Sequence, residues 1–87
     1  MIRVIFKSRY PFFDKEEHGN KCCTVRELSQ DDSRFDDLME ILQADDYFGR
    51  KDIIEIRNPQ SGDFFERIIT DVSYFDERFI ISWRHKK

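Results

Sequence analysis

Three side chains with useful chemistry lie close together in the segment HGNKCCTVREL, residues 18–28: Lys21, Thr24 and Arg26. If residues 22–28 form a strand, Thr24 and Arg26 share one of its faces, because strand side chains alternate. Lys21 stands at the strand entrance, where its flexible stem can swing toward the same side. An amine, a hydroxyl and a guanidinium together can bind a carboxylate, a phosphate or a base edge. We therefore predict a ligand pocket lined by these three residues.

A second interpretation needs no ligand. Thr24 would then favour the strand conformation, and the charged side chains would pair with Glu27 or with the acidic helix. Alternation places Cys22 on the face of Thr24 and Arg26, and it places Cys23 and Val25 on the other. We expect the face of Cys23 and Val25 to point into the core.

The elements before this segment are a strand and a short helix. Residues 2–6 put Ile2, Val4 and Phe6 on one face at period two, which is typical of a strand. Residues 11–18 begin at Pro11, which is tolerated in a first helical turn, and run into Gly19 and Asn20, which suit a helix C-terminus. We predict a strand at 2–6 and a helix of about two turns at 11–18.

A longer helix is predicted over residues 31–44. Its apolar residues follow the i, i+3, i+4, i+7 spacing of a helix that packs on a core: Phe35, Leu38, Met39 and Leu42. Oxygen-bearing side chains before them can cap its N-terminus: Ser29, Asp31, Asp32 and Ser33.

Three strands are predicted in the remainder, at residues 52–58, 63–73 and 78–84, joined by polar turns. Alternation in these strands suggests inward side chains in three sets: Ile54 and Ile56; Phe64, Ile68 and Val72; Phe79, Ile81 and Trp83. The predicted order is β-α-β-α-β-β-β. Five short strands in 87 residues favour one α+β domain, residues 1–87, with a strongly curved sheet or small barrel and two helices. A cleft between the first helix and strand 22–28 would hold the ligand.

Composition excludes several classes of protein. The net charge of −3 argues against nonspecific coating of nucleic acid. No apolar run is long enough to span a bilayer, and the first residues lack the pattern of a signal peptide, so we expect a cytoplasmic protein with no membrane partner. Adjacent Cys22 and Cys23 cannot easily bridge each other. Neither a C-x-x-C nor an H-x-x-x-H pair occurs, so we expect no metal site and no cofactor.

The pattern K-x-x-T-x-R after a short helix and a glycine resembles the signature of ASCH domains, which belong to the PUA-like superfamily of small β-barrels. The motif match covers roughly residues 2–28, and the rest agrees as strand pattern. The resemblance implies binding of RNA or a modified nucleoside. Some small ASCH proteins are amidohydrolases of N4-acylated cytidine, in which a Lys, a Thr and a later Glu are catalytic. Lys21 and Thr24 would match the first two, and Glu55, Glu66 and Glu77 are candidates for the third, of which we select Glu66.

The sequence thus leaves three functions open. The first is an RNA-binding or nucleoside-binding module that uses Lys21, Thr24 and Arg26, with an aromatic side chain stacked on the base. The second is the amidohydrolase. The third follows from a resemblance to short phage and bacterial proteins: an acidic interaction protein that binds a host protein through the pairs Asp31/Asp32, Asp36/Asp37 and Asp45/Asp46. The sequence does not determine the oligomeric state.

Overall fold

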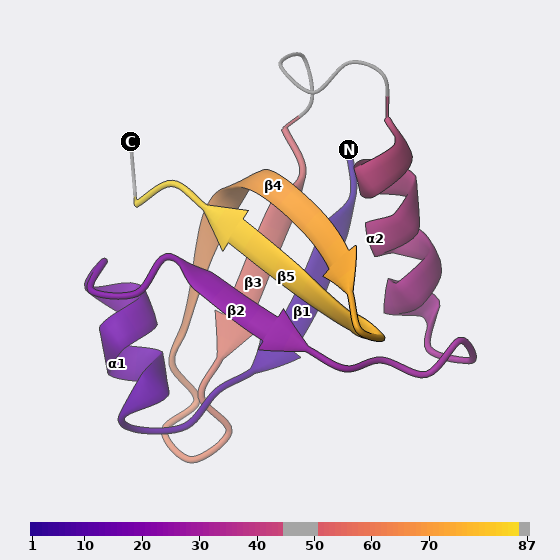
Figure 1. Cartoon of the computed structure of the whole chain (residues 1–87). Coiled ribbons are helices and arrows are strands. Elements are labelled where there is room, and N and C mark those ends of the chain that lie inside the picture. The colour runs from indigo at the N-terminus through magenta and orange to yellow at the C-terminus, as the bar shows by residue number, and fades with distance from the viewer. Residues whose placement is uncertain (45–50, 86–87) are drawn as a thin grey trace.

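The computed structural model describes residues 1–44 and 51–85, and it confirms the predicted α+β class and element order (Figure 1). The elements are β1 (Arg3–Lys7), α1 (Phe12–Glu17), β2 (Cys23–Arg26), α2 (Ser33–Gln43), β3 (Ile53–Arg57), β4 (Phe64–Phe75) and β5 (Arg78–Trp83). The acidic pair Asp45/Asp46 lies outside the described residues. In the described part of the chain, no helix is long and apolar enough to cross a membrane.

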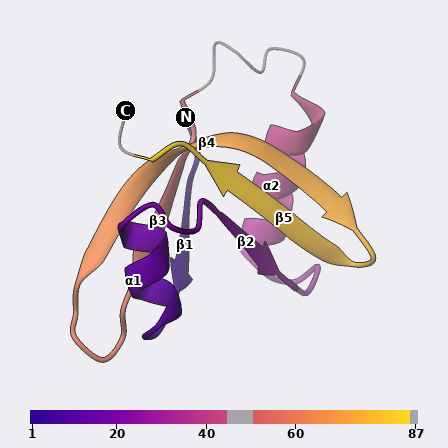
Figure 2. The ribbon, with the colours of Figure 1, turned by 60° about the vertical axis from the view of Figure 1, so that its left-hand side comes forward.

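All five strands belong to one mixed sheet in the order β1-β3-β4-β5-β2. The β1–β3 pair is parallel, and the β3–β4, β4–β5 and β5–β2 pairs are antiparallel. Strand β4 is the longest, and it pairs with β3 along its first half and with β5 along its second half. An irregularity in its pairing between Ile69 and Asp71 accompanies the change of partner. The sheet therefore curls into a half-barrel, visible as the arch of β4 in Figure 2.

The core fills the inside of this curl. It combines aliphatic and aromatic side chains from every element except β2: Val4, Phe6, Phe13, Leu38, Ile41, Ile54, Ile56, Phe65, Ile69, Val72, Phe79, Ile81 and Trp83. Helix α2 packs on β1 and β4. Leu38 and Ile41 form its buried face, and Phe35, Met39 and Leu42 pack partly buried against the core. The helical spacing seen in the sequence was therefore correct, although it omitted Ile41.

Strand registers agree with the sequence prediction where a strand is regular. Val4 and Phe6 of β1 are buried, as are the inward sets predicted for β3 and β5. In β4 the prediction was wrong for Phe64, which is exposed, and for Ile68, which is only half-buried. Phe65 and Ile69 point inward instead. Val72 is buried as predicted, because the irregularity at Ile69/Asp71 shifts the alternation between the two halves of the strand.

The two faces of β2 are reversed relative to the prediction. Thr24 is only 3% exposed, whereas Val25 is 54% exposed and points outward. Thr24 lies opposite Ile81 of β5, and directly paired residues of neighbouring strands share a face of the sheet. Since Ile81 is fully buried in the core, Thr24 must face inward with it.

Helix α1 is short, and tertiary contacts fix it at the side of the molecule opposite α2 (Figures 1 and 2). Phe13 is buried and packs against Phe65, with ring centroids 5.3 Å apart. Arg67 of β4 donates a hydrogen bond of 2.8 Å to the carbonyl oxygen of Glu17, which satisfies one of the last carbonyls of the helix. These two contacts determine which side of α1 faces the sheet.

The chain leaves α1 through Gly19, whose φ of +83° favours glycine. A Cβ atom at this position would lie only 2.7 Å from Cγ of His85. Gly62 has nearly the same φ, +82°, but a Cβ there would meet no atom within 4 Å. The two glycines therefore share a backbone requirement, and only Gly19 also has a steric one.

We expect Gly62→Ala to lower the free energy of unfolding by about 1 kcal/mol through backbone strain alone. Gly19→Ala should cost more, by up to about 1 kcal/mol, because the exposed His85 ring must also turn away. Urea unfolding monitored by circular dichroism measures both losses. In a His85→Ala background, Gly19→Ala should cost no more than Gly62→Ala does. Equal losses for the two glycine variants in the otherwise unchanged chain would contradict the steric account.

Candidate ligand-binding hollow

A surface hollow of about 340 Å³ lies between the end of β1, helix α1 and strand β2. Its volume is near the lower end of the range of about 300–1,000 Å³ that is usual for small-molecule sites. Its walls are formed by residues from these three regions: Lys7, Ser8, Arg9, Phe12, Glu16, Lys21, Thr24, Val25 and Arg26. Lys21, Thr24 and Arg26, which we singled out from the sequence, are therefore brought to one place.

Arg26 is the most extensively bonded residue of this hollow. Its Nε donates to Oγ1 of Thr24 at 2.9 Å, Nη1 donates to the carbonyl oxygen of Lys7 at 2.9 Å, and Nη2 donates to Oγ of Ser8 at 2.8 Å. The guanidinium also lies over the Phe6 ring, 5.0 Å from its centroid. Burial lowers the pKa of Arg26 from its ordinary value, and the nearby Glu16 carboxylate partly offsets this effect.

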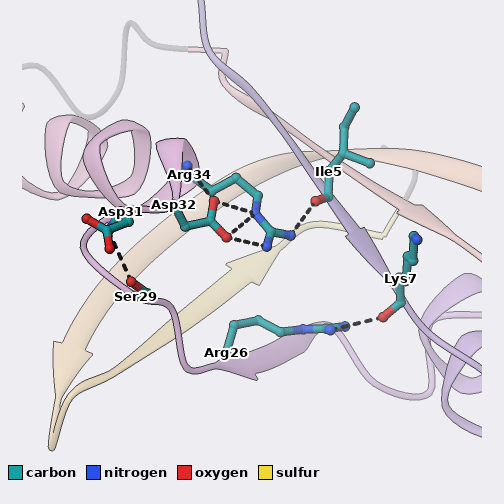
Figure 3. A network of polar contacts seen from close by, with 7 residues as sticks. All are labelled: Ile5, Lys7, Arg26, Ser29, Asp31, Asp32 and Arg34. Atoms are coloured by element: carbon teal, nitrogen blue, oxygen red, sulfur yellow. Dashed lines mark hydrogen bonds and ion pairs between the residues drawn. The ribbon is translucent and has the colours of Figure 1, made fainter.

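A second guanidinium, that of Arg34, binds strand β1 two residues away from the contact made by Arg26. Arg34 of α2 donates to the carbonyl oxygen of Ile5 at 2.9 Å, while Arg26 binds that of Lys7, as Figure 3 shows. Arg34 is held by Asp32, which also caps α2 by accepting from the Arg34 backbone N–H at 3.0 Å. Hydrogen bonds from the Arg34 side chain and backbone lower the pKa of Asp32 to about 2. Asp32 belongs to one of the acidic pairs that we considered as a surface for a protein partner, and it has a structural role: it caps α2 and holds the Arg34 side chain.

The hydroxyl of Thr24 is oriented by Arg26. Its oxygen already accepts a hydrogen bond from Nε of Arg26. A hydroxyl that accepts from one partner can donate its proton to another. Because Thr24 is buried in the wall of the hollow, an acceptor atom of a ligand is a suitable partner for that proton.

Lys21 stands at the mouth of the hollow with its side chain 37% exposed. The amine lies 5.3 Å from the centroid of the Phe12 ring and 3.9 Å from Oε2 of Glu16. At that distance the contact with Glu16 is a loose ion pair, which leaves the amine able to turn toward a ligand.

Glu16 is a wall residue that the sequence analysis missed. It is only 1% exposed, and its Oε1 atom has no hydrogen-bond partner among the described residues. Glu16 lies three residues after Phe13, so the two side chains share the face of α1 that meets the sheet. That spacing was the available signal, but a glutamate in a short, charged helix is normally a solvated residue.

The carboxylates proposed from the sequence do not line this hollow. Glu66 pairs with Arg3, and the buried Glu55 pairs with Arg3 and Arg57 on the β1-β3-β4 part of the sheet. A hydrogen bond from Arg57 lowers the pKa of Glu55. Glu77 lines a separate, smaller hollow of about 240 Å³ beside Tyr74. Among the described residues around the first hollow, Glu16 is the single carboxylate.

The charge of this hollow is opposite in sign to that of the chain. Lys7, Arg9, Lys21 and Arg26 all line it, against the one carboxylate, whereas the whole chain carries a net charge of −3. Such a local concentration of cations attracts an anionic or carbonyl-rich ligand even when the protein as a whole is acidic.

No protein-family model matches this sequence, and no curated protein matches it. The function must therefore be inferred from the geometry of the hollow.

Arg26→Lys should lower the free energy of unfolding by about 2 kcal/mol, because a lysine cannot serve Thr24, Lys7 and Ser8 at once. Arg78→Lys is the matched control, since Arg78 is half exposed and makes ion pairs of 3.3 and 3.8 Å at the surface. The control should change stability by less than about 0.5 kcal/mol. Chemical unfolding of both variants measures the two losses of unfolding free energy. Similar losses would show that the hydrogen bonds of Arg26 stabilise the fold no more than a surface ion pair does.

Proposed function

We propose that this protein is a binding module for RNA or for a modified nucleoside, and that the base enters the hollow between α1 and β2. The observation that carries the proposal is the convergence of Lys21, Thr24 and Arg26 on one hollow of about 340 Å³. The ASCH-like motif in the sequence supports the same class of ligand. So does the local excess of cations, which suits the carbonyl and phosphate oxygens of a nucleotide.

The wall of the hollow offers the two kinds of contact that nucleobase recognition uses. Phe12 is 56% exposed and lines the hollow, so one face of its ring is available for stacking on a base. The Thr24 hydroxyl and the Lys21 amine can donate to ring nitrogens or carbonyl oxygens. Lys7 and Arg9 lie at the exposed rim, where they can contact phosphate.

Titration of the protein with cytidine, N4-acetylcytidine and a short single-stranded RNA, followed by NMR, tests the proposal. We expect at least one of these ligands to bind, with shifts confined to residues around the hollow. Lys21→Ala should weaken that binding at least about tenfold, since it removes a hydrogen bond from a charged donor. Lys51→Ala is the control, because Lys51 is exposed and does not line the hollow.

If none of these ligands binds, the proposal is wrong. Capture of one stoichiometric protein partner in the same experiments would then favour an interaction protein instead.

A second candidate function is hydrolysis of N4-acylated cytidine. The observation that favours it is the presence of Glu16 and Lys21, 3.9 Å apart, beside Thr24 in the same hollow. The reaction adds water across the acyl C–N bond, so the oxygen goes to the acyl carbon and a proton goes to the leaving amine. Lys21 and Glu16 would move that proton, and the Thr24 hydroxyl would stabilise the acyl oxygen. Glu16 takes the place that we assigned to Glu66 from the sequence.

Release of cytidine from N4-acetylcytidine, measured by chromatography, tests this second function. Lys21→Ala should abolish turnover, and Glu16→Gln should reduce it at least about a hundredfold, which is a usual loss for a general acid or base. Glu17→Gln, one residue further along the same helix, should leave turnover unchanged. No turnover by the unaltered protein, or full turnover by Lys21→Ala, would exclude this mechanism.

A further inference from the structure

The charge of the nearby Arg26 guanidinium explains the burial of Glu16 only in part. One carboxylate oxygen, Oε2, lies 3.9 Å from the amine of Lys21, and the other, Oε1, has no hydrogen-bond partner among the described residues. A buried carboxylate oxygen without a donor is unfavourable, and native proteins rarely retain one without a reason. Because the residue forms part of the wall of the hollow, that reason can be a ligand.

The remaining polar groups of the hollow are mostly donors. Thr24 accepts one hydrogen bond from Arg26 and has its proton to donate, and Lys21 presents N–H groups only. A ligand held by these two residues brings acceptor atoms to them. Glu16 is the single side-chain group in the described wall that can only accept when ionised.

We propose that Glu16 determines specificity by accepting a hydrogen bond from an amino group of the ligand, so that the hollow selects bases that carry an exocyclic N–H beside a ring acceptor. This inference rests on the proposed binding of a base. It adds to that proposal a chemical rule about which bases enter: those without the amino group leave the buried oxygen unpaired and bind weakly.

The Lys21 amine lies beside Oε2 of Glu16 in the wall of the hollow. The Lys21 side chain is partly exposed, its amine lies over the Phe12 ring, and its contact with Glu16 is loose at 3.9 Å. A ligand that draws the amine toward its own acceptor atom moves Lys21 away from the carboxylate and leaves room there for the amino group. The same ligand edge thus engages both residues.

The experiment compares two pairs of nucleosides that differ only in the exocyclic amino group: cytidine with 2-pyrimidinone riboside, and adenosine with purine riboside. The unaltered protein should bind the amino-bearing member of at least one pair at least about tenfold more tightly, as expected for one hydrogen bond to a charged acceptor. Glu16→Met, which keeps the bulk of the side chain and removes the acceptor, should bring that ratio close to one. Glu17→Met is the matched control and should preserve the ratio.

Absolute affinity provides an independent readout. Glu16→Met removes the carboxylate that offsets the burial of the Arg26 guanidinium, so its urea midpoint should fall, but its affinity for 2-pyrimidinone riboside and purine riboside should not. Weaker binding of these two nucleosides by Glu16→Met would show that Glu16 supports the shape of the hollow and not its specificity, and it would overturn the inference.

Equal affinity within both pairs, or an unchanged ratio in Glu16→Met, would also overturn the inference and would leave base binding itself intact. Failure of all four nucleosides and of RNA to bind would remove both proposals together.

Discussion

Two guanidinium groups hold the free edge of β1, and the shape of the molecule depends on them. Strand β1 lies at one end of the sheet and β2 at the other, so Arg26 of β2 connects the two edges when it binds the Lys7 carbonyl. Arg34 of α2 binds the Ile5 carbonyl of the same edge. The Phe6 ring lies beneath both guanidiniums, 5.0 and 4.7 Å from their central carbons. An exposed strand edge would be open to association with other chains, and here side chains cover it.

The hollow is a by-product of this closure. A half-barrel whose edges are joined by a side chain, and not by backbone hydrogen bonds, leaves a gap between them beside that side chain. Helix α1 covers one side of the gap, because Phe13 packs on Phe65 and Arg67 holds the end of the helix. The arginine that stabilises the sheet is therefore also a wall of the candidate site. Changes at Arg26 should consequently affect stability and ligand affinity together.

The sequence alone predicted the buried positions of the regular elements correctly. It failed where contacts with distant parts of the chain override the local pattern of apolar and polar residues. Alternating β-branched and aromatic residues correctly identified Ile54, Ile56 and Ile81 as core. Thr24 was assigned to the wrong face, because its burial follows from the pairing of β2 with the distant strand β5, which no alternation pattern within β2 records. The predicted inward set of β4 was wrong in its first half, because the alternation of the strand shifts at the irregularity near Asp71. Glu16 was missed for a related reason, since the burial of a glutamate depends on how its helix docks and not on its neighbours in sequence.

The order in which the chain is synthesised gives the position of the hollow a further meaning. All of its wall residues lie between Lys7 and Arg26, so they leave the ribosome before β5 does. Strand β2, however, pairs with β5 near the other end of the sequence, and the turn at Gly19 rests against His85. The residues that line the hollow are thus made before β5, yet they reach their final arrangement only after β5 has emerged. A nascent chain would therefore complete the candidate hollow only after β5 has been made.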